Sequence, residues 1–392
     1  MPARCFPQSS VLQRSKTAAC ERAPALFVAS DFCRRPGFGR QHPLSIPRVS
    51  AVLQLCECLG WLDEKRFRVS RVASVAELTA FHDPAYVEAL RASDAVGRVE
   101  PPLRERYGFG NFENPLFPGV FERASTAVGG SILAAELALE GRAVFHPAGG
   151  THHGRRDRAS GFCFFNDPVF AIRRLLEGGV ARVLYVDLDA HHGDGVQEAF
   201  LDDGRVRVVS IHEQGRWPHS GAAQDVGHGY ACNLPVPSGF NDSELEFLLD
   251  EVVLPLAGQF LPEAVVVTCG TDALAGDPLS ALALSNVALW DAVERVIGPG
   301  GPAVVLGGGG YNPWTLARCW TGLWGRLSGR EIPVELPAAA QLILDGLECD
   351  LVDEDDVEAA WLTTLADAPR PGAIRTEVKS LASQGRARHV LA

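Results

Sequence analysis

The sequence predicts an α/β fold, in which a single domain is built around a central parallel β-sheet with helices on both faces. Short apolar runs rich in β-branched residues alternate with segments of helical periodicity, which is typical of a parallel sheet that is buried on both sides. Apolar residues make up 46% and charged residues 21% of the 392 residues, so the chain can bury a large core. No segment between Ala25 and Gly325 has the composition of a linker, which favours one domain over several.

The first elements are expected in this order. Residues 25–30 (ALFVAS) predict a strand, and residues 49–59, after the break at Pro47, predict a helix. The aromatic and proline-rich residues 109–118 (FGNFENPLFP) predict a structured loop. Residues 125–139 are mostly small and apolar, and they predict a helix that buries most of its surface.

The alternation of strands and helices continues after this helix. In chain order, the expected elements are a strand at 143–145, a helix at 169–177, strands at 183–189 and 206–211, a helix at 243–260, a strand at 264–269, a helix at 283–297 and a strand at 303–306. Beyond Glu331 we expect helices without a specific motif.

The domain is expected to occupy residues 25–382. Residues 1–24 contain no acidic residue before Glu21 and no apolar signal-peptide core, so they are predicted to be a disordered N-terminal extension. Residues 383–392 are predicted to form a frayed C-terminal tail.

Charge and cysteine content argue against several classes of protein. The chain carries 36 Lys and Arg against 48 Asp and Glu, and the net charge of −12 argues against nucleic acid as a direct partner. No uncharged apolar run reaches the roughly 18 residues of a membrane span. The ten cysteines include no C-x-x-C pair, which favours reduced thiols and a cytoplasmic location.

Polar residues that can bind metal or transfer protons follow four of the expected strands. His152 and His153 follow the strand at 143–145, and Tyr311 follows the last strand after four glycines. Aspartate and histidine residues also follow the strands at 183–189 and 264–269. Because ligands bind outside the carboxyl ends of the strands in an open α/β sheet, we expect these side chains to form one site.

The pattern Asp187-x-Asp189-x-His191 indicates a divalent metal ion. Alternate residues at a strand end point to the same side, and two carboxylates with one imidazole suit zinc best. Asp272, after a neighbouring strand, can supply a further oxygen. Three protein ligands and an open position are typical of a catalytic zinc ion, although salt-bridged loop residues remain an alternative.

The neighbouring polar residues indicate proton transfer. The carboxylates of Asp187 and Asp194 are available to orient His152 and His153, which fixes the tautomer of an imidazole and raises its basicity. Tyr311 can donate a hydrogen bond to a developing oxyanion, or it can be a tyrosine at the rim of a pocket. The four glycines before it lack the context of a phosphate-binding loop.

Taken together, these motifs resemble the histone deacetylase family, which also contains acetoin-utilisation proteins and acetylpolyamine amidohydrolases. The matching stretches are GGTHHG at 149–154, SGFCFFND at 160–167, YVDLDAHHGDG at 185–195, SIH at 210–212, GTDALAGDP at 270–278 and GGGGYN at 307–312. The resemblance covers residues 25–330 and implies an arginase-like fold with a central parallel sheet flanked by helices.

The resemblance also implies roles for particular residues. The implied site consists of the zinc ligands Asp189, His191 and Asp272, the catalytic residues His152, His153, Asp187, Asp194 and Tyr311, and the substrate-binding residues Gly161, Phe162, Trp217 and Glu113. His153 would be the general base, oriented by Asp194, and Tyr311 would polarise the acetyl carbonyl. Phe162 and Trp217 would wall a narrow tunnel for the aliphatic arm of the substrate.

Three further roles follow from the resemblance alone. His152 would pair with Asp187, and the backbone of Gly161 would accept an N–H of the substrate. One Zn2+ per chain is implied, together with a structural K+. The potassium site would involve Asp187, Asp189, His191, Ser210 and Ile211, and a second monovalent site would lie near Phe200 and Val206.

The chain departs from the family pattern around the tunnel. Trp217 stands where many relatives carry Phe or Tyr, and Pro218-His219-Ser220-Gly221 replaces the usual P-G-T-G. Glu113, the best match to the rim acid of eukaryotic deacetylases, is one methylene longer than the usual Asp. These changes leave the size of the substrate open.

The implied reaction is hydrolysis of an N-acetyl or N-acyl amide, which releases acetate and a free amine from acetyl-lysine or a small acetylated amine. A binuclear manganese ureohydrolase on the same fold is one alternative, although Phe162 and Tyr311 would make a slot too lipophilic for a guanidinium. A catalytically inactive module that binds acyl-lysine is another. Acyl length, oligomeric state and the choice between zinc and iron stay open.

Overall fold

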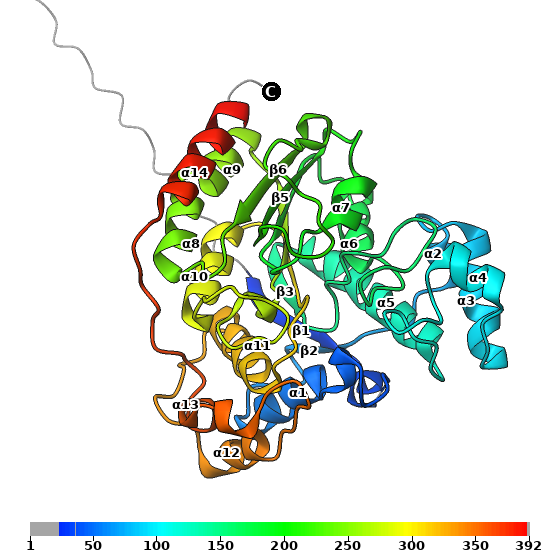
Figure 1. The fold of residues 1–392 in the computed structure, drawn as a ribbon, viewed down its shortest axis with the longest axis horizontal. Helices are drawn as coiled ribbons and strands as arrows, with labels where there is room; N and C mark the ends of the chain where they lie inside the picture. Colours follow the sequence, from blue (N-terminus) through cyan, green and yellow to red (C-terminus); the bar gives the residue numbers. More distant parts are fainter. Residues whose placement is uncertain (1–22, 36, 390–392) are drawn as a thin grey trace, which may run out of the picture.

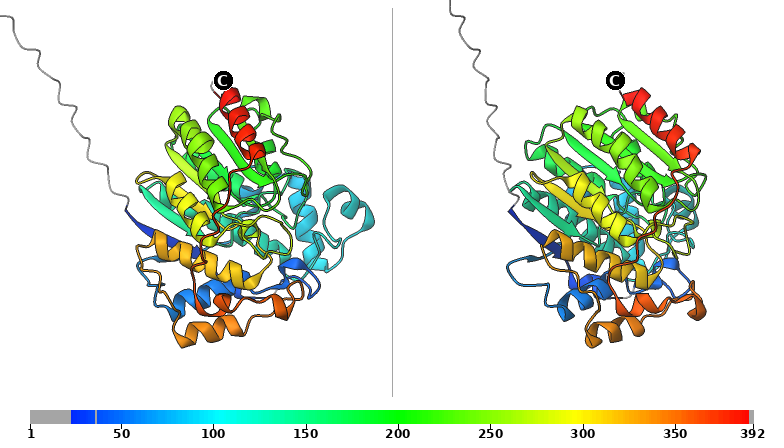
Figure 2. Two further views of the ribbon diagram at one scale, coloured as in Figure 1. Left: turned by 60° about the vertical axis from the view of Figure 1, so that its left-hand side comes forward. Right: turned by 90° about the vertical axis from the view of Figure 1, so that its left-hand side faces the viewer.

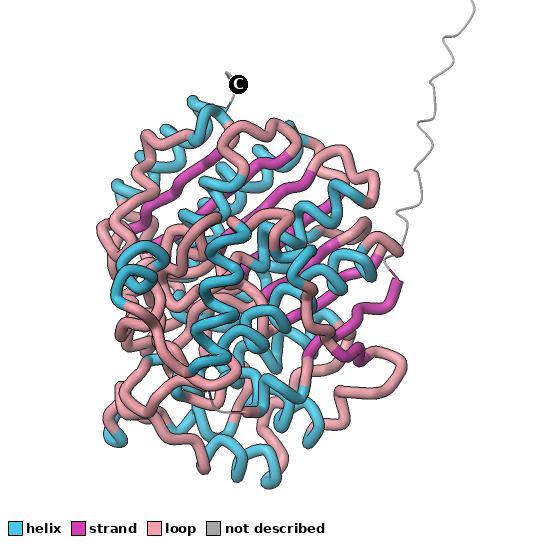
Figure 3. The backbone as a smooth tube through the Cα atoms, turned by 90° about the vertical axis from the view of Figure 1, so that its right-hand side faces the viewer, coloured by secondary structure: helices cyan, strands magenta, loops and turns pink. Residues whose placement is uncertain are grey.

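The protein is organised around one eight-stranded sheet in which every pair of neighbouring strands is parallel. The structure is a computed structural model, and it describes residues 23–35 and 37–389. The strands are β1 (Ala23–Ala29), β2 (Phe67–Val69), β3 (Arg142–His146), β4 (Val183–Asp187), β5 (Val206–Glu213), β6 (Ala231–Val236), β7 (Ala264–Thr268) and β8 (Ala303–Leu306). They lie side by side (Figure 3). Their order in the sheet is β2-β1-β3-β8-β7-β4-β5-β6. The predicted α/β fold with a central parallel sheet is confirmed.

The central strands are buried on both faces, as their apolar sequences predict. All five residues of β4 are buried. Leu184 and Val186 point into the core on one face of the sheet, and Val183 and Tyr185 point into the core on the other. This two-sided burial explains why β4 has a continuous apolar run instead of an alternating one.

Helices cover both faces of the sheet (Figure 1). They are α1 (Arg48–Cys58), α2 (Val75–Leu78), α3 (Pro84–Val96), α4 (Pro101–Tyr107), α5 (Val120–Ala138), α6 (Asp167–Glu177), α7 (Asp194–Ala199), α8 (Asp242–Leu248), α9 (Leu254–Phe260), α10 (Asn286–Ile297), α11 (Pro313–Leu327), α12 (Ala338–Asp345), α13 (Ala359–Thr363) and α14 (Thr376–His389). Helices α5 to α7 pack on one face, whereas α1 and α8 to α14 contribute to the core on the other. A third cluster joins α3, α4 and the outer side of α5 to the aromatic residues of the neighbouring loops.

Most of the expected elements are present, within a few residues of the predicted bounds. The helix expected at 243–260 consists of α8, a π-helical turn at Leu249–Val253, and α9. Several elements were not predicted from the sequence, namely β2, β6, α2 to α4, α7 and α11. Strand β6 contains Asn233 and Pro235, which weaken its strand propensity, and it forms by pairing with β5 at the edge of the sheet.

The two ends of the domain differ from the expected bounds. Strand β1 begins at Ala23, and residues 1–22 of the predicted extension lie outside the described residues. Residues 383–389 of the tail that was predicted to fray belong to α14. This helix packs against β6 (Figure 2). It buries Val378, Leu381 and Ala382. Residues 390–392 lie outside the described part.

Among the described residues, none of the helices is both long enough and apolar enough to cross a membrane.

Candidate active site

The four strands whose ends carry the predicted site residues are neighbours in the sheet, in the order β3-β8-β7-β4. All four are parallel, so the loops that follow them emerge at the same edge. Asp187, the last residue of β4, pairs in register with Thr268 of β7. The sheet order therefore brings together side chains that lie more than a hundred residues apart in the sequence.

Three of these side chains converge on one point. Ligand atoms of Asp189, His191 and Asp272 all lie within 4.8 Å of one another. The Nδ1 atom of His191 is 3.1 Å from Asp189 Oδ1 and 2.9 Å from Asp272 Oδ2. Both carboxylates are fully buried. Two buried carboxylates and an imidazole in this arrangement form a donor set that suits a zinc ion.

Backbone N–H groups hold the two carboxylates in place. Gly309 donates to Asp189 Oδ2 at 2.6 Å, and Ala190 donates to Asp272 Oδ1 at 3.0 Å. A Cβ on Gly309 would lie only 2.0 Å from Asp272 Oδ2, and one on Gly270 only 2.2 Å from Asp189 Oδ2. The glycine-rich loop is therefore required for close approach of the backbone to these carboxylates.

The charged groups of Asp189, His191 and Asp272 favour binding of a cation. Burial and the negative charge of Asp189 raise the pKa of Asp272 to about 6. Burial opposes protonation of His191, but the hydrogen bonds to Asp189 and Asp272 outweigh it and raise the His191 pKa to about 10. Two buried carboxylates thus favour a positive charge beside them, and a divalent metal ion would meet this requirement.

The two adjacent histidines each bond to a different carboxylate. His152 Nδ1 donates to Asp187 Oδ2 at 2.7 Å, and His153 Nδ1 donates to Asp194 Oδ1 at 2.8 Å. Tyr185 also donates to Asp187 Oδ2 at 2.7 Å. The structure thus brings together both histidine–aspartate pairs that the resemblance implied.

The two histidines have opposite pKa shifts. Burial disfavours the charged form of His152, but the charges of Asp187 and Asp189 outweigh it and raise its pKa to about 9. Burial and the nearby charge of His152 lower the pKa of His153 to about 3. His153 is therefore neutral near pH 7, and its Nε2 atom is free to accept a proton.

A cavity of about 590 Å³ leads to these residues, and its lining includes His153, His191, Phe162, Trp217 and Tyr311. The Trp217 ring meets the ring of His153 edge-on, with centroids 4.6 Å apart, and the rings of Phe162 and Tyr311 are 6.0 Å apart. The structure therefore places both predicted wall residues and Tyr311 in the same cavity.

Gly161 allows Trp217 to approach His153. It has a φ of 54°, and a Cβ on it would lie 2.3 Å from the Trp217 ring and 2.6 Å from the His153 ring. Its N–H donates to Glu113 Oε1 at 2.5 Å. Glu113 lines the same cavity, so the predicted rim acid lies beside Gly161 and bonds to it through one oxygen.

Two residues near Tyr311 were given no role in the site from the sequence. Asp277 Oδ2 accepts the N–H of Tyr311 at 2.7 Å, and the guanidinium of Arg48 donates to the carbonyl of Gly308. Asp277 lies in the GTDALAGDP motif, which was the only available signal. Arg48 begins α1, 260 residues from its partner, and no local pattern indicates that contact.

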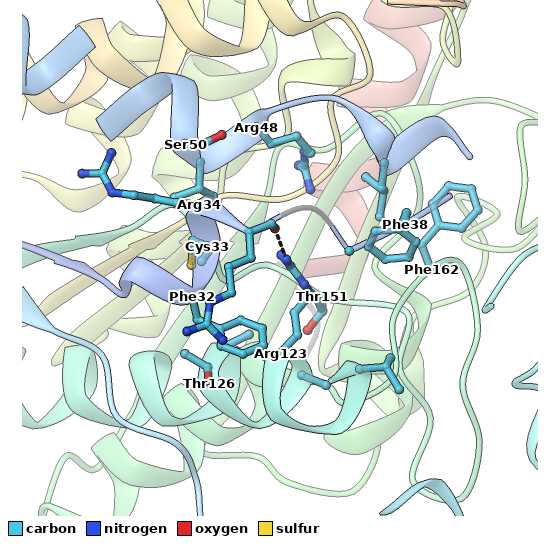
Figure 4. Close-up of a pocket in the computed structure, with 18 of the residues that line it drawn as sticks. Phe32, Cys33, Arg34, Phe38, Arg48, Ser50, Arg123, Thr126, Thr151 and Phe162 are labelled. Carbon is cyan, nitrogen blue, oxygen red and sulfur yellow. Dashed lines mark hydrogen bonds between the residues drawn. The ribbon is translucent and has the colours of Figure 1, made fainter. Parts of the chain in front are cut away.

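Arg48 also lines a second cavity, which Figure 4 shows in close-up. This cavity lies among the residues before α1, the start of α1 and part of α5. Phe162 contributes to both cavities, so the two adjoin at this side chain.

The residues implied for potassium lie next to the metal site. Asp187 and Ser210 pair in register on β4 and β5, and Ile211 follows within β5. Phe200 directly follows α7, and Val206 begins β5. A monovalent cation at either place remains a proposal.

Comparison with known proteins identifies the group to which this arrangement belongs. The family model described as "Histone deacetylase domain" matches residues 42–327. The chain belongs to the histone deacetylase family. It is 37% identical to histone deacetylase 8 of Xenopus tropicalis over 298 residues, which are 74% of this chain and 80% of that protein. It is 34% identical to the acetoin utilization protein AcuC of Bacillus subtilis over 329 residues, which are 80% of this chain and 84% of that protein.

Solved structures of the histone deacetylase family show the same fold. A histone deacetylase homologue from Aquifex aeolicus superposes with a TM-score of 0.87 and 39% identity, over 93% of this chain and all of that one. A homologue structure in complex with SAHA has the same TM-score and 38% identity, over the same shares of the two chains. The resemblance and the arginase-like fold expected from it are confirmed, and the chain is a hydrolase of the deacetylase type.

Proposed function

We propose that this protein is a zinc-dependent deacetylase that hydrolyses the N-acetyl amide of acetyl-lysine or of a small acetylated amine. The observation that carries the proposal is the convergence of Asp189, His191 and Asp272 beside a cavity that also contains His153 and Tyr311. One zinc ion per chain fits this donor set, and a bound zinc ion polarises a carbonyl and lowers the pKa of water. Family membership favours this function over the ureohydrolase alternative.

His153 and Tyr311 have different roles in the proposed reaction, since His153 transfers a proton and Tyr311 keeps its own. His153 is neutral and held through Nδ1, so Nε2 accepts the proton of the attacking water and returns it to the leaving amine. Tyr311, whose pKa is raised well above its usual value by burial and by the charges of Asp272 and Asp189, keeps its proton. It therefore acts as a neutral donor to the carbonyl oxygen as negative charge develops there.

The cavity supports a substrate with an unbranched arm. Phe162 and Trp217 give it apolar walls, and Leu279 lies in the same lining. The carboxylate of Glu113 and the carbonyl of Gly161 offer hydrogen-bond acceptors to the part of the substrate outside the tunnel. We further propose a cytoplasmic location and structural K+ binding beside Asp187 and Ser210.

A panel of acetylated peptides and acetylated polyamines, incubated with zinc-loaded protein, tests the substrate directly. Release of acetate from at least one member is expected, and the preferred class identifies the substrate. A hydroxamate should inhibit, since it chelates zinc while its chain occupies the tunnel. Zinc-loaded protein that hydrolyses no N-acyl amide would overturn the proposed function in favour of an acyl-lysine binding module.

Replacing Tyr311 with phenylalanine tests the oxyanion donor. The variant keeps the ring and its packing but loses the hydroxyl, so kcat should fall by about 10²–10³ while zinc content stays unchanged. A trifluoroacetyl amide, whose carbonyl needs less polarisation, should be less affected. Steady-state kinetics on acetyl and trifluoroacetyl substrates check this, and equal rates for wild type and variant on acetyl-lysine would show that Tyr311 is only a rim residue.

A further inference from the structure

Arg155 makes contacts beside the catalytic histidine that the proposed mechanism does not use. It lies in the loop that carries His152 and His153, two residues after His153. Its Nη2 atom donates to Asp194 Oδ2, and its Nη1 atom donates to Glu198 and lies 3.4 Å from the backbone oxygen of Asp194. Arg155 therefore reaches the carboxylate that orients His153.

The carboxylate of Asp194 is held through both of its oxygens. Oδ1 accepts from His153 Nδ1 at 2.8 Å and from the N–H of Gly195 at 2.9 Å, and Oδ2 accepts from Arg155. The Asp194 side chain is only 4% exposed, so little water competes for these bonds. With both oxygens engaged, the carboxylate cannot rotate away from His153 without breaking a charge-assisted hydrogen bond.

Two parallel connections thus join the same two segments. His153 and Arg155 belong to the loop after β3, and Asp194 and Glu198 belong to α7. The His153–Asp194 bond alone fixes a distance, whereas the added Arg155 contacts also fix the orientation of the carboxylate relative to the loop.

We propose that Arg155 is a positioning residue for the deacetylation reaction, which holds Asp194 in the orientation that keeps Nε2 of His153 directed at the reacting water. The inference rests on the proposed function. Arg155 does not line the substrate cavity but a neighbouring one that it shares with Glu113 and Glu198, and its hydrogen bonds reach the reaction through Asp194. Arg155 would orient Asp194 in the same way that residues hydrogen-bonded to metal ligands orient those ligands.

The competing interpretation is an ordinary surface ion pair. The Glu198 side chain is 54% exposed, and exposed pairs of this kind contribute little to stability. A surface pair predicts unchanged catalysis after its removal. The contact with Asp194 separates the two interpretations, because it connects Arg155 through Asp194 to His153.

Kinetics of Arg155→Met provide the first test. We expect kcat to fall by roughly 10-fold to 100-fold, with KM, zinc content and melting temperature nearly unchanged. Arg155→Lys should recover part of kcat, since its ammonium group can reach Asp194 as a single donor. Arg156→Met is the matched control, because Arg156 is exposed, carries the same charge and follows directly in the chain. A wild-type kcat for Arg155→Met, or equal losses in the two methionine variants, would overturn the proposal.

A double-mutant cycle with Asp194→Asn gives the second test. If Arg155 acts through Asp194, adding Arg155→Met to Asp194→Asn should change kcat by less than about 2-fold, because the interaction is already broken. If the loss of kcat in the double variant equals the product of the losses in the two single variants, the inference is contradicted.

A proton NMR measurement distinguishes failure of this inference from failure of the proposed function. The Nδ1–H of His153 should give a downfield signal in the zinc-loaded protein, and Arg155→Met should shift or broaden it whether or not the substrate is known. An unchanged signal rejects the positioning role. A changed signal in a protein that hydrolyses no amide confirms the contact and rejects the proposed reaction.

Discussion

Replacing His191 with alanine is expected to remove the metal ion and the activity together. The imidazole supplies the only nitrogen among the three converging ligands, and the two remaining carboxylates would face each other in a fully buried site. A catalytic zinc site has three protein ligands and the variant keeps only two, so the affinity for zinc should fall far below that of the wild type. Elemental analysis after dialysis should find one zinc per chain in the wild type and almost none in His191→Ala, and turnover should be undetectable.

His192→Ala is the matched control for this experiment. His192 is also buried, but its ring bonds to Ser220 and Gln197 instead of the metal ligands. The control should therefore keep its zinc. Added zinc should raise the melting temperature of the wild type and of His192→Ala, because a ligand stabilises the folded state that binds it, but not that of His191→Ala. Full zinc occupancy in His191→Ala would show that the ligand assignment is wrong.

The second large effect is expected from His153→Ala. This change removes the group that accepts and returns the proton, which is worth roughly 10²–10⁴ in rate, yet it leaves all three metal ligands in place. Zinc content should therefore match that of the wild type while kcat falls by that factor. Asp194→Asn should lower kcat less, because the imidazole remains and loses only its orienting carboxylate. Metal analysis and kcat on the preferred acetyl amide measure both effects.

The neighbouring histidine provides the comparison for this prediction. The ring centroids of His152 and His153 lie 3.9 Å apart, but burial and the neighbouring charges shift the pKa values of the two residues in opposite directions. The charges of Asp187 and Asp189 raise the pKa of His152 to about 9, whereas the pKa of His153 is lowered, so the two imidazoles differ in how readily they hold a proton. A much larger loss of kcat in His152→Ala than in His153→Ala would therefore mean that the two roles are exchanged.

Local sequence signals were sufficient to predict the central strands. Strand β8 lies at the predicted residues because its four apolar residues are followed at once by glycines. Strands β4 and β7 were predicted for the same reason, as short β-branched runs that end in polar residues. Strand β6 was missed, because its sequence is ambiguous and its conformation depends on pairing with β5.

The residue types of the candidate site could be predicted from the sequence, but the hydrogen bonds between them could not. The residue types and their spacing already indicated a metal site with Asp189, His191 and Asp272, since these residues follow strand ends in a pattern that suits zinc. The spacing left open which aspartate would orient which histidine, and the resemblance to the family supplied that pairing. The hydrogen bonds of the two histidines agree with it.

The sequence by itself determined the fold class, the order of most elements and the residue types of the site, because these depend on local periodicity and on short motifs. Only the tertiary structure decided the strand order that brings β4, β7, β8 and β3 together, and with it the convergence of side chains from distant segments. The contacts of Arg155 and Arg48 were likewise decided by the fold. A long arginine side chain can bond to any acceptor that tertiary packing places near it, so its partner cannot be predicted from a local sequence pattern.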